Sequence, residues 1–97
     1  MYRPLPIEIT VGKSNIQGNG LIAVCNIAAN IELGISHIKD NRFLDGYIRT
    51  PLGGFINHSE NPNCCIYEVD NVLKIKTIKN ISKGEELTIY YTLYRVN

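Results

Sequence analysis

Apolar and polar residues alternate over several short stretches of this chain, a pattern typical of half-buried β-strands. The alternation is clearest in Ile7–Val11 and in Val72–Ile78. Together with four further apolar runs, these stretches predict six strands, over residues 7–11, 21–25, 31–34, 64–69, 72–78 and 86–91. Asp70-Asn71 is a turn signal, so residues 64–78 are predicted to form a hairpin.

The stretch from residue 36 to residue 50 has no clear period. Asp40 is a candidate cap for a single helical turn through Phe43 and Leu44. Downstream, Pro51 and a Gly-Gly pair interrupt any regular element. The two apolar residues that follow, Phe55 and Ile56, are predicted to belong to the core. The pattern as a whole predicts a mostly-β, barrel-like fold with almost no helix.

Length and composition fit one small domain over residues 1–97. Fifteen isoleucines favour strands over helices. The net charge is +1 and no block of like charge occurs, which argues against direct binding of nucleic acid. No run approaches the ~20 apolar residues of a membrane span. The first 25 residues also lack the apolar segment of a signal peptide.

The three cysteines, Cys25, Cys64 and Cys65, do not form a disulfide framework, because their number is odd and their spacing irregular. Adjacent residues of a strand point to opposite faces, so Cys64 and Cys65 are poorly placed to bind one metal ion. No Cys-x-x-Cys pair occurs, so we predict no metal site. Three free thiols indicate a reducing, intracellular compartment.

Two polar segments carry the candidate chemistry. Residues 57–64 read Asn-His-Ser-Glu-Asn-Pro-Asn-Cys, and residues 81–91 read Ile-Ser-Lys-Gly-Glu-Glu-Leu-Thr-Ile-Tyr-Tyr. Taken alone, the first is compatible with a polar connecting loop, and the second with a turn followed by an edge strand. Together and in this order, they resemble the signature of the SET-domain protein-lysine methyltransferases. That family carries Asn-His-Ser-x-x-Pro-Asn-Cys and then Gly-Glu-Glu-Leu-Thr-x-x-Tyr.

The resemblance extends upstream over nearly the whole chain. Residues 14–23 resemble the family's Gly-x-Gly loop and strand, and residues 27–34 its next turn and strand. The resemblance implies the mostly-β SET-domain β-clip of small curved sheets. In that fold the segments around Asn57 and Tyr91 cross in a pseudoknot-like C-terminal threading. A small sugar- or cofactor-binding β-clip is an alternative for the glycine loop, but it does not predict the Asn-His-Ser segment.

The activity implied by the resemblance is transfer of a methyl group from S-adenosylmethionine to a lysine of another protein, with histones as the familiar substrate. Such a displacement needs alignment and a desolvated amine, and it needs no metal. Tyr91 aligns with the family's catalytic tyrosine, whose hydroxyl would orient the lysine amine. The alternative for Tyr91 is a packing role in the core or in a hairpin.

The cofactor would be bound by residues of both segments and of the glycine loop. Asn57 would bond its methionine end through the side-chain amide, and His58 would meet the adenine edge chiefly through its main chain. Tyr94 would stack on adenine or line the lysine channel, since an aromatic face suits either role. The backbone of the loop would approach the methionine part at Gly18, Asn19 and Gly20, two of which have no Cβ to obstruct it.

Several positions depart from the family pattern. Ile89 stands where an aromatic residue often influences the number of methyl groups added, and Tyr90 follows where a small polar residue is frequent. Both are predicted to line the substrate channel, with Tyr47 as a further wall. The chain lacks the cysteine-rich segment that completes the channel in many members, and its brevity resembles minimal viral or bacterial SET proteins. We therefore expect a homodimer in which a second subunit supplies the missing wall. The alternative function is a catalytically silent module that binds protein or cofactor.

Overall fold

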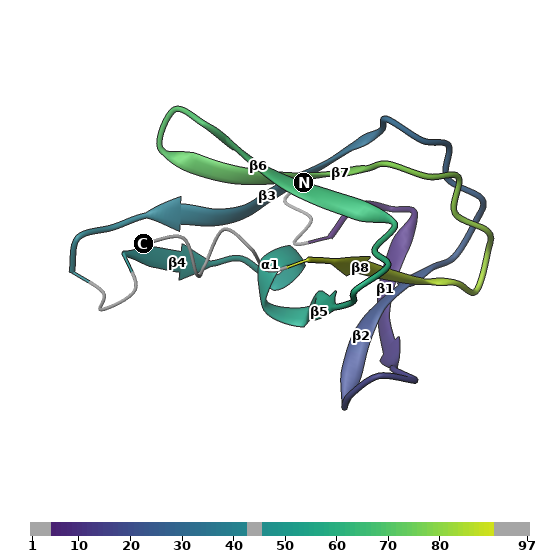
Figure 1. Cartoon of the computed structure of the whole chain (residues 1–97). Helices are drawn as coiled ribbons and strands as arrows, with labels where there is room; N and C mark the ends of the chain where they lie inside the picture. The colour runs from purple at the N-terminus through teal and green to yellow at the C-terminus, as the bar shows by residue number, and fades with distance from the viewer. Residues whose placement is uncertain (1–4, 43–45, 91–97) are drawn as a thin grey trace.

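The computed structural model describes residues 5–42 and 46–90 of the 97-residue chain. This part forms two four-stranded sheets and one short helix (Figure 1). In chain order the elements are β1 (Ile9–Lys13), β2 (Asn19–Ala23), β3 (Glu32–Lys39), β4 (Tyr47–Arg49), α1 (Pro51–Phe55), β5 (Asn57–His58), β6 (Cys64–Val69), β7 (Val72–Thr77) and β8 (Glu86–Ile89).

The first sheet has the strand order β1-β2-β8-β5 and joins segments from distant parts of the chain. β1 and β2 form an antiparallel hairpin, and β8 adds to the free edge of β2 through the pair Leu21↔Leu87. β5 then pairs with β8 in parallel, with Asn57 opposite Thr88 and His58 opposite Ile89. The Asn-His-Ser segment and the last strand are therefore neighbours in space.

The second sheet has the order β4-β3-β7-β6; its strands β3, β7 and β6 run across the upper part of Figure 1, and β4 lies below them on the left. Its β6–β7 hairpin turns at Asp70, which adopts a left-handed backbone conformation with φ of 55°. Aspartate is one of the few residues that tolerate this conformation, which explains the turn signal in the sequence.

The helix α1 begins where the hydroxyl of Thr50 caps it. The Thr50 side chain accepts a hydrogen bond from the Gly53 N–H, and Pro51 occupies the first turn, where its missing N–H costs nothing. The same hydroxyl donates to the Ile35 carbonyl at 2.7 Å, which ties the helix to β3. Gly53 then packs directly on the backbone of Ser36, so closely that any Cβ at this position would overlap the Ser36 carbonyl oxygen.

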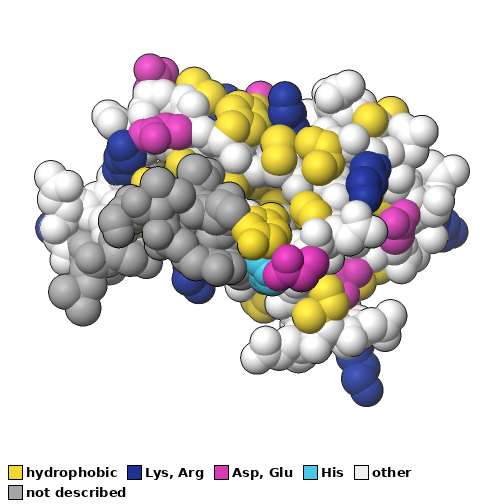
Figure 2. All heavy atoms as spheres, viewed as in Figure 1, with side chains coloured by type: hydrophobic (Ala, Val, Ile, Leu, Met, Phe, Trp, Pro, Cys, Tyr) yellow, Lys and Arg dark blue, Asp and Glu magenta, His cyan; other side chains and the backbone are white. Residues whose placement is uncertain are grey.

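The core lies between the two sheets and α1. It contains the buried apolar residues Ile9, Leu21, Ala23, Ile27, Leu33, Leu52, Ile56, Cys64, Ile75, Ile81, Leu87 and Ile89. Burying one such aliphatic side chain contributes about 1.5–3 kcal/mol. On the outer surface, hydrophobic side chains also gather across the upper middle of the face shown in Figure 2, among charged side chains of both signs.

The structure confirms the mostly-β fold and each of the six predicted strands, with ends shifted by up to five residues. The third strand is longer than predicted, because the stretch 36–39 that showed no period continues it. The preceding strand ends at Arg49, before Pro51, as predicted, but the sequence did not predict the short helix that begins there, which Thr50 caps. Ile56 is a core residue as predicted, whereas Phe55 is 39% exposed and is not. The predicted helical turn after Asp40 includes residues 43–45, which lie outside the described residues.

Candidate functional site

The loop between β1 and β2 closes on itself through Ser14. The Ser14 N–H donates to the Gly18 carbonyl at 2.9 Å, and the Ser14 hydroxyl oxygen accepts from the N–H groups of Ile16 and Gln17 at 2.8 and 3.1 Å. Gly18 has a φ of +53°, and nothing lies within 4 Å of where its Cβ would be. The predicted glycine loop is therefore a tight turn with open space above it.

Three segments meet at the base of this loop. The Ser14 hydroxyl donates to the carboxylate of Glu86, at 2.8 and 2.9 Å from its two oxygens. Asn57 donates through Nδ2 to the same carboxylate at 2.8 Å. The first residue of the loop, the start of β5 and the start of β8 thus share one polar cluster, which we call the Ser14–Asn57–Glu86 cluster.

Gly20 allows this cluster to form. It is buried in β2, and a Cβ built on it would overlap Glu86 Oε2 and lie 3.1 Å from Asn57 Nδ2. The absent side chain makes room for the carboxylate and the amide together. Gly20 therefore serves the cluster directly, whereas Gly18 serves the turn.

Asn63 fastens the loop after β5 to the last strand. Its side-chain N–H donates to the Glu86 carbonyl at 2.8 Å, and its side-chain oxygen accepts from the Thr88 N–H at 2.9 Å. Asn63 is only 7% exposed, so both of these backbone groups of β8 are satisfied by one buried amide. These two hydrogen bonds explain the structural role of the asparagine in the Pro-Asn part of the sequence motif.

His58 faces the end of β8. Its ring lies 4.8 Å from the ring of Tyr90, with a tilt of 50°, and its Nε2 is 3.2 Å from the Glu60 carboxylate. The backbone N–H of Ser59 donates to the Ile89 carbonyl at 2.9 Å and continues the parallel pairing. The main chain around His58 is thus held by β8, and its ring by the neighbouring aromatic residue.

The remaining predicted channel residues lie in different surroundings. Ile89 is fully buried within the core, and Tyr90 is half-buried. Tyr47 lies in β4 of the second sheet, where its ring packs edge-on against His37 at 5.8 Å. Tyr91 and Tyr94 lie outside the described residues, so their roles stay predictions.

The sequence motifs contain two site residues to which no role was assigned, Ser14 and Glu86. Ser14 stands at the first position of the glycine-loop motif, and Glu86 is the second glutamate of the Gly-Glu-Glu-Leu-Thr segment. Sequence alone cannot separate the two glutamates, although they act differently. The Glu85 carboxylate accepts from the Ser82 N–H at 2.8 Å and shapes the turn, whereas that of Glu86 points into the cluster.

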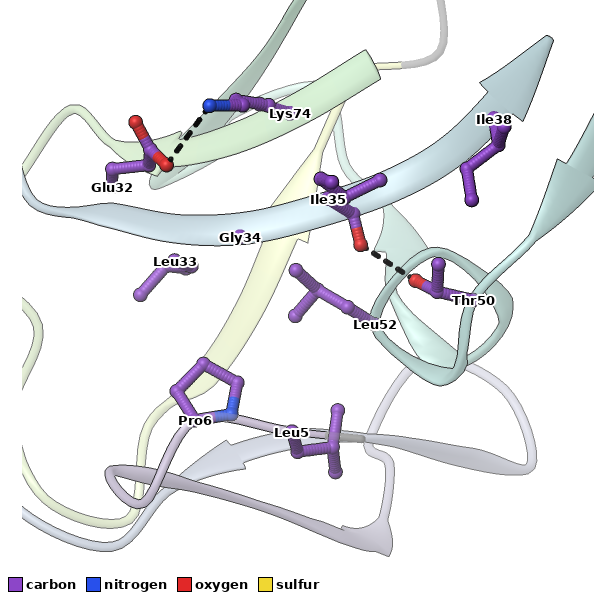
Figure 3. A pocket seen from close by; sticks show the side chains of 10 residues that line it. All are labelled: Leu5, Pro6, Glu32, Leu33, Gly34, Ile35, Ile38, Thr50, Leu52 and Lys74. Carbon is purple, nitrogen blue, oxygen red and sulfur yellow. Dashed lines mark hydrogen bonds and ion pairs between the residues drawn. The ribbon is translucent and has the colours of Figure 1, made fainter. Parts of the chain in front are cut away.

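A separate hollow of about 580 Å³ lies between β3, the start of α1 and the N-terminal segment (Figure 3). Its wall is mostly aliphatic, with Leu33 and Leu52 facing Leu5 and Pro6 across it, and the Glu32–Lys74 ion pair at one rim. Among the described residues that were predicted to bind cofactor or substrate, none lines this hollow.

In the described part of the chain, no group of three or more His, Cys, Asp or Glu side chains is arranged to hold a metal ion. Burial raises the pKa of the Cys64 thiol to about 12, so this thiol stays protonated at neutral pH. Among the described helices, none is long and apolar enough to cross a bilayer.

The chain has the fold of a SET domain, and the SET-domain family matches residues 33–92. The chain therefore belongs to the SET-domain family. It is 39% identical, over 71 residues, to a histone-lysine N-methyltransferase of Mycosarcoma maydis described as specific for H3 lysine 36. That match covers 64% of this chain but spans only 7% of the relative's length.

Solved structures agree with this assignment. A candidate histone methyltransferase of Plasmodium falciparum is 25% identical, with a TM-score of 0.68, and the match covers 87% of this chain and 92% of that one. The SET domain of the RIZ1 tumour suppressor is 20% identical, with a TM-score of 0.71, over 91% of this chain and 71% of that one, which shows a shared fold. A relationship to minimal viral or bacterial SET proteins stays a prediction.

Proposed function

We propose that this chain transfers a methyl group from S-adenosylmethionine to a lysine side chain of another protein. The observation that carries the proposal is the convergence of the glycine loop, β5 and β8 on one polar cluster, although Ser14 and Glu86 are 72 residues apart. Family membership supports the reaction class, and we take the cluster as the place where the family's cofactor would bind.

The residues around the cluster are the ones we propose to bind the methionine end of that cofactor. The open space at Gly18 admits a close approach to the loop backbone, and the Asn57 side chain lies at the base of the same loop. When bound, S-adenosylmethionine supplies a sulfonium-activated methyl group for direct displacement by a neutral amine. This chain's contribution is to position the reactants and to exclude water, which together lower the barrier without a metal ion.

Tyr91 is the residue we propose to orient the lysine amine, through its phenol. Its position directly follows Tyr90, which contacts His58, and this neighbourhood supports a location close to the cofactor site. We assign Tyr90, Ile89 and Tyr47 to the channel wall and Tyr94 to the adenine or to that wall. Because Ile89 is buried in the core, it would act by setting the width of the channel from behind.

The substrate we propose is a protein lysine, with a histone tail as the first candidate, because the Mycosarcoma maydis relative is described as a histone methyltransferase. A homodimer, in which the partner completes the channel, belongs to the same proposal. The second candidate function is a silent module that binds cofactor or protein without turnover.

Incubation with methyl-labelled S-adenosylmethionine, histones and cell lysate tests the activity. We expect label in protein with the wild type, and a loss of at least about 100-fold with Tyr91→Phe, because a positioned hydroxyl typically contributes this much. Tyr67→Phe is the matched control, since the Tyr67 hydroxyl bonds Glu32 on the other sheet. Binding of S-adenosylhomocysteine without any labelled protein would favour the silent module, and absence of binding would refute the proposed function.

A further inference from the structure

The strand β6 has a free edge along which backbone groups point out of the second sheet. In the described part of the chain β6 pairs with β7 on one side only. The Ile78 N–H donates to the Asn63 carbonyl at 2.9 Å, and from this pair onward every second residue of β6 is hydrogen-bonded to β7. The alternate residues, Ile66 and Glu68 among them, turn their N–H and C=O groups to the free edge. Among the described residues, these groups of Ile66 and Glu68 have no partner.

The other three edges of the described sheets have features that discourage pairing. β4 and β5 have only three and two residues. β1 contains Gly12 and ends in Lys13, and its Ile9 N–H is already bonded to the Pro6 carbonyl at 3.1 Å. Proteins commonly protect sheet edges with short strands, lysines and glycines.

β6 has none of these protective features. It has six residues without Gly, Pro or Lys, and its register with β7 is unbroken from Cys64 to Val69. Four of the six residues are aromatic, β-branched or part of the apolar core, as is typical of strands that pair well. Among the described edges, β6 is therefore the one best suited to pair with another strand.

The side chains of β6 favour an identical strand as the partner. Cys65, Tyr67 and Val69 share one face of the strand and are uncharged at neutral pH. Glu68 is the one acidic residue of β6, and it already forms an ion pair with Lys39. A charged segment of another protein would gain no new ion pair here, whereas two copies would bring no unpaired like charges together.

We infer that β6 pairs in antiparallel with β6 of a second copy of this chain, about a two-fold axis at Tyr67. Ile66 then lies opposite the partner's Glu68, and each of the two such pairs exchanges two backbone hydrogen bonds. Tyr67 lies opposite the partner's Tyr67, and an aromatic pair across two strands adds stability. An axis at Ile66 would instead require contact with Cys64, which is fully buried.

This contact goes beyond the proposed function and does not depend on it. β6 and β4 are opposite edges of the second sheet, so pairing through β6 does not cover β4, where Tyr47 lies. It is therefore additional to the contact proposed to complete the substrate channel. Its consequence is one continuous sheet that runs through both copies.

Disulfide cross-linking tests the pairing and its register. Cys65 would lie opposite the partner's Val69 in a pair without hydrogen bonds, where Cα atoms are about 4.5 Å apart and a disulfide can form. Within one copy, residues 65 and 69 are about 13 Å apart along the strand, too far to be joined. Val69→Cys should therefore give a covalent dimer on mild oxidation, in a Cys25→Ser background that removes the exposed thiol. Peptide mapping should find Cys65 joined to residue 69 of the other copy.

Ile78→Cys in the same background is the matched control, because Ile78 and Val69 are similarly exposed, at 42% and 37%. We expect at least about 10-fold less covalent dimer from it, since residue 78 follows β7 at the end of the hairpin away from the turn. Cys64 does not compete, because burial raises the pKa of its thiol to about 12 and keeps it protonated. Equal amounts of covalent dimer from both variants, or no bridge between residues 65 and 69, would refute the pairing.

Sedimentation equilibrium provides a second measurement, with two variants of Glu68. Both Glu68→Ala and Glu68→Pro lose the ion pair with Lys39, but only proline also removes the outward N–H, which β7 does not use. Glu68→Pro should weaken self-association by about 10- to 30-fold relative to Glu68→Ala, as expected for two lost backbone hydrogen bonds in each dimer.

Equal self-association of the two Glu68 variants, or a wild type that stays monomeric up to about 1 mM, would overturn the inference. The cross-linking result decides the matter if Glu68→Pro does not fold. Both measurements are made without cofactor or substrate, so failure of this contact and failure of the proposed methyl transfer are separate results.

Discussion

Two adjacent glycines of α1 provide a direct test of how tightly the helix packs on β3. At Gly53 a Cβ would overlap the Ser36 carbonyl oxygen and lie 2.9 Å from its carbonyl carbon. At Gly54 a Cβ would meet nothing within 4 Å, and the residue is exposed. Gly53→Ala and Gly54→Ala therefore make the same chemical change, one residue apart, in opposite surroundings.

The expected loss in the free energy of unfolding for Gly53→Ala has two parts. Overpacking a site bounded by backbone costs about 1–3 kcal/mol. Relief of the clash moves α1 away from β3 and strains the hydrogen bond from the Thr50 N–H to the Ser36 carbonyl, now 2.9 Å long, which is worth about 1 kcal/mol. We expect a total loss of about 2–4 kcal/mol in the free energy of unfolding. Gly54→Ala should instead gain about 0.5–1 kcal/mol, because alanine restricts the unfolded chain.

Urea unfolding followed by far-ultraviolet circular dichroism measures both effects. At an unchanged slope, the midpoint should fall for Gly53→Ala and rise slightly for Gly54→Ala. For a domain of this size, each kcal/mol corresponds to a shift in Tm of about 4–8 °C. Equal midpoints for the two variants would refute the close approach of α1 to β3.

Three further outcomes follow from the contacts. Asn63→Ala should lower the free energy of unfolding by about 2–4 kcal/mol, because it leaves a buried N–H of Thr88 and a carbonyl of Glu86 without partners. The control is Ser59→Ala, which removes only an exposed hydrogen bond of the loop and should cost under about 1 kcal/mol in the same urea assay. Thr50→Ala should cost about 1–2 kcal/mol and Thr50→Ser much less, and equal losses would contradict the capping role of the hydroxyl. The pKa of the Cys64 thiol is raised from 9.0 to about 12, so the stabilisation of the folded state by the protonated thiol is complete below pH 9. As the pH rises toward about 12, the free energy of unfolding should fall by ~1.4 kcal/mol per pH unit from this group. Cys64→Ala should therefore show a shallower decline of the free energy of unfolding between these pH values.

The sequence predicted six of the eight strands in the described part of the chain and missed β4 and β5, which have only three and two residues. Val72–Thr77 alternates between half-buried and buried residues along its whole length, as the pattern indicated. The helix α1 was missed because its two glycines and its proline are poor helix formers. What makes it a helix is a tertiary contact, the close approach of Gly53 to β3, together with the Thr50 cap. Neither leaves a periodic signal in five residues.

Part of the candidate site could likewise be predicted from the sequence, and part could not. The motif around Asn57 could be recognised in the sequence, and its pairing with β8 agrees with the expected proximity of the two segments. The direction in which the Asn57 amide points could not be predicted, since it depends on acceptors contributed by Ser14, Gln17 and Glu86. Which of two neighbouring glutamates faces inward is likewise decided by the register of β8 against β2.

The hydrogen bond between Ser14 and Glu86 spans 72 positions, so it can form only after residue 86 has been synthesised. Closing so long a loop carries an entropic cost that early, local contacts do not repay. The glycine turn can therefore exist in a nascent chain, but the polar cluster must wait for β8 to leave the ribosome. The site proposed for the cofactor would then be completed only after β8 has been made, well after the glycine turn has formed.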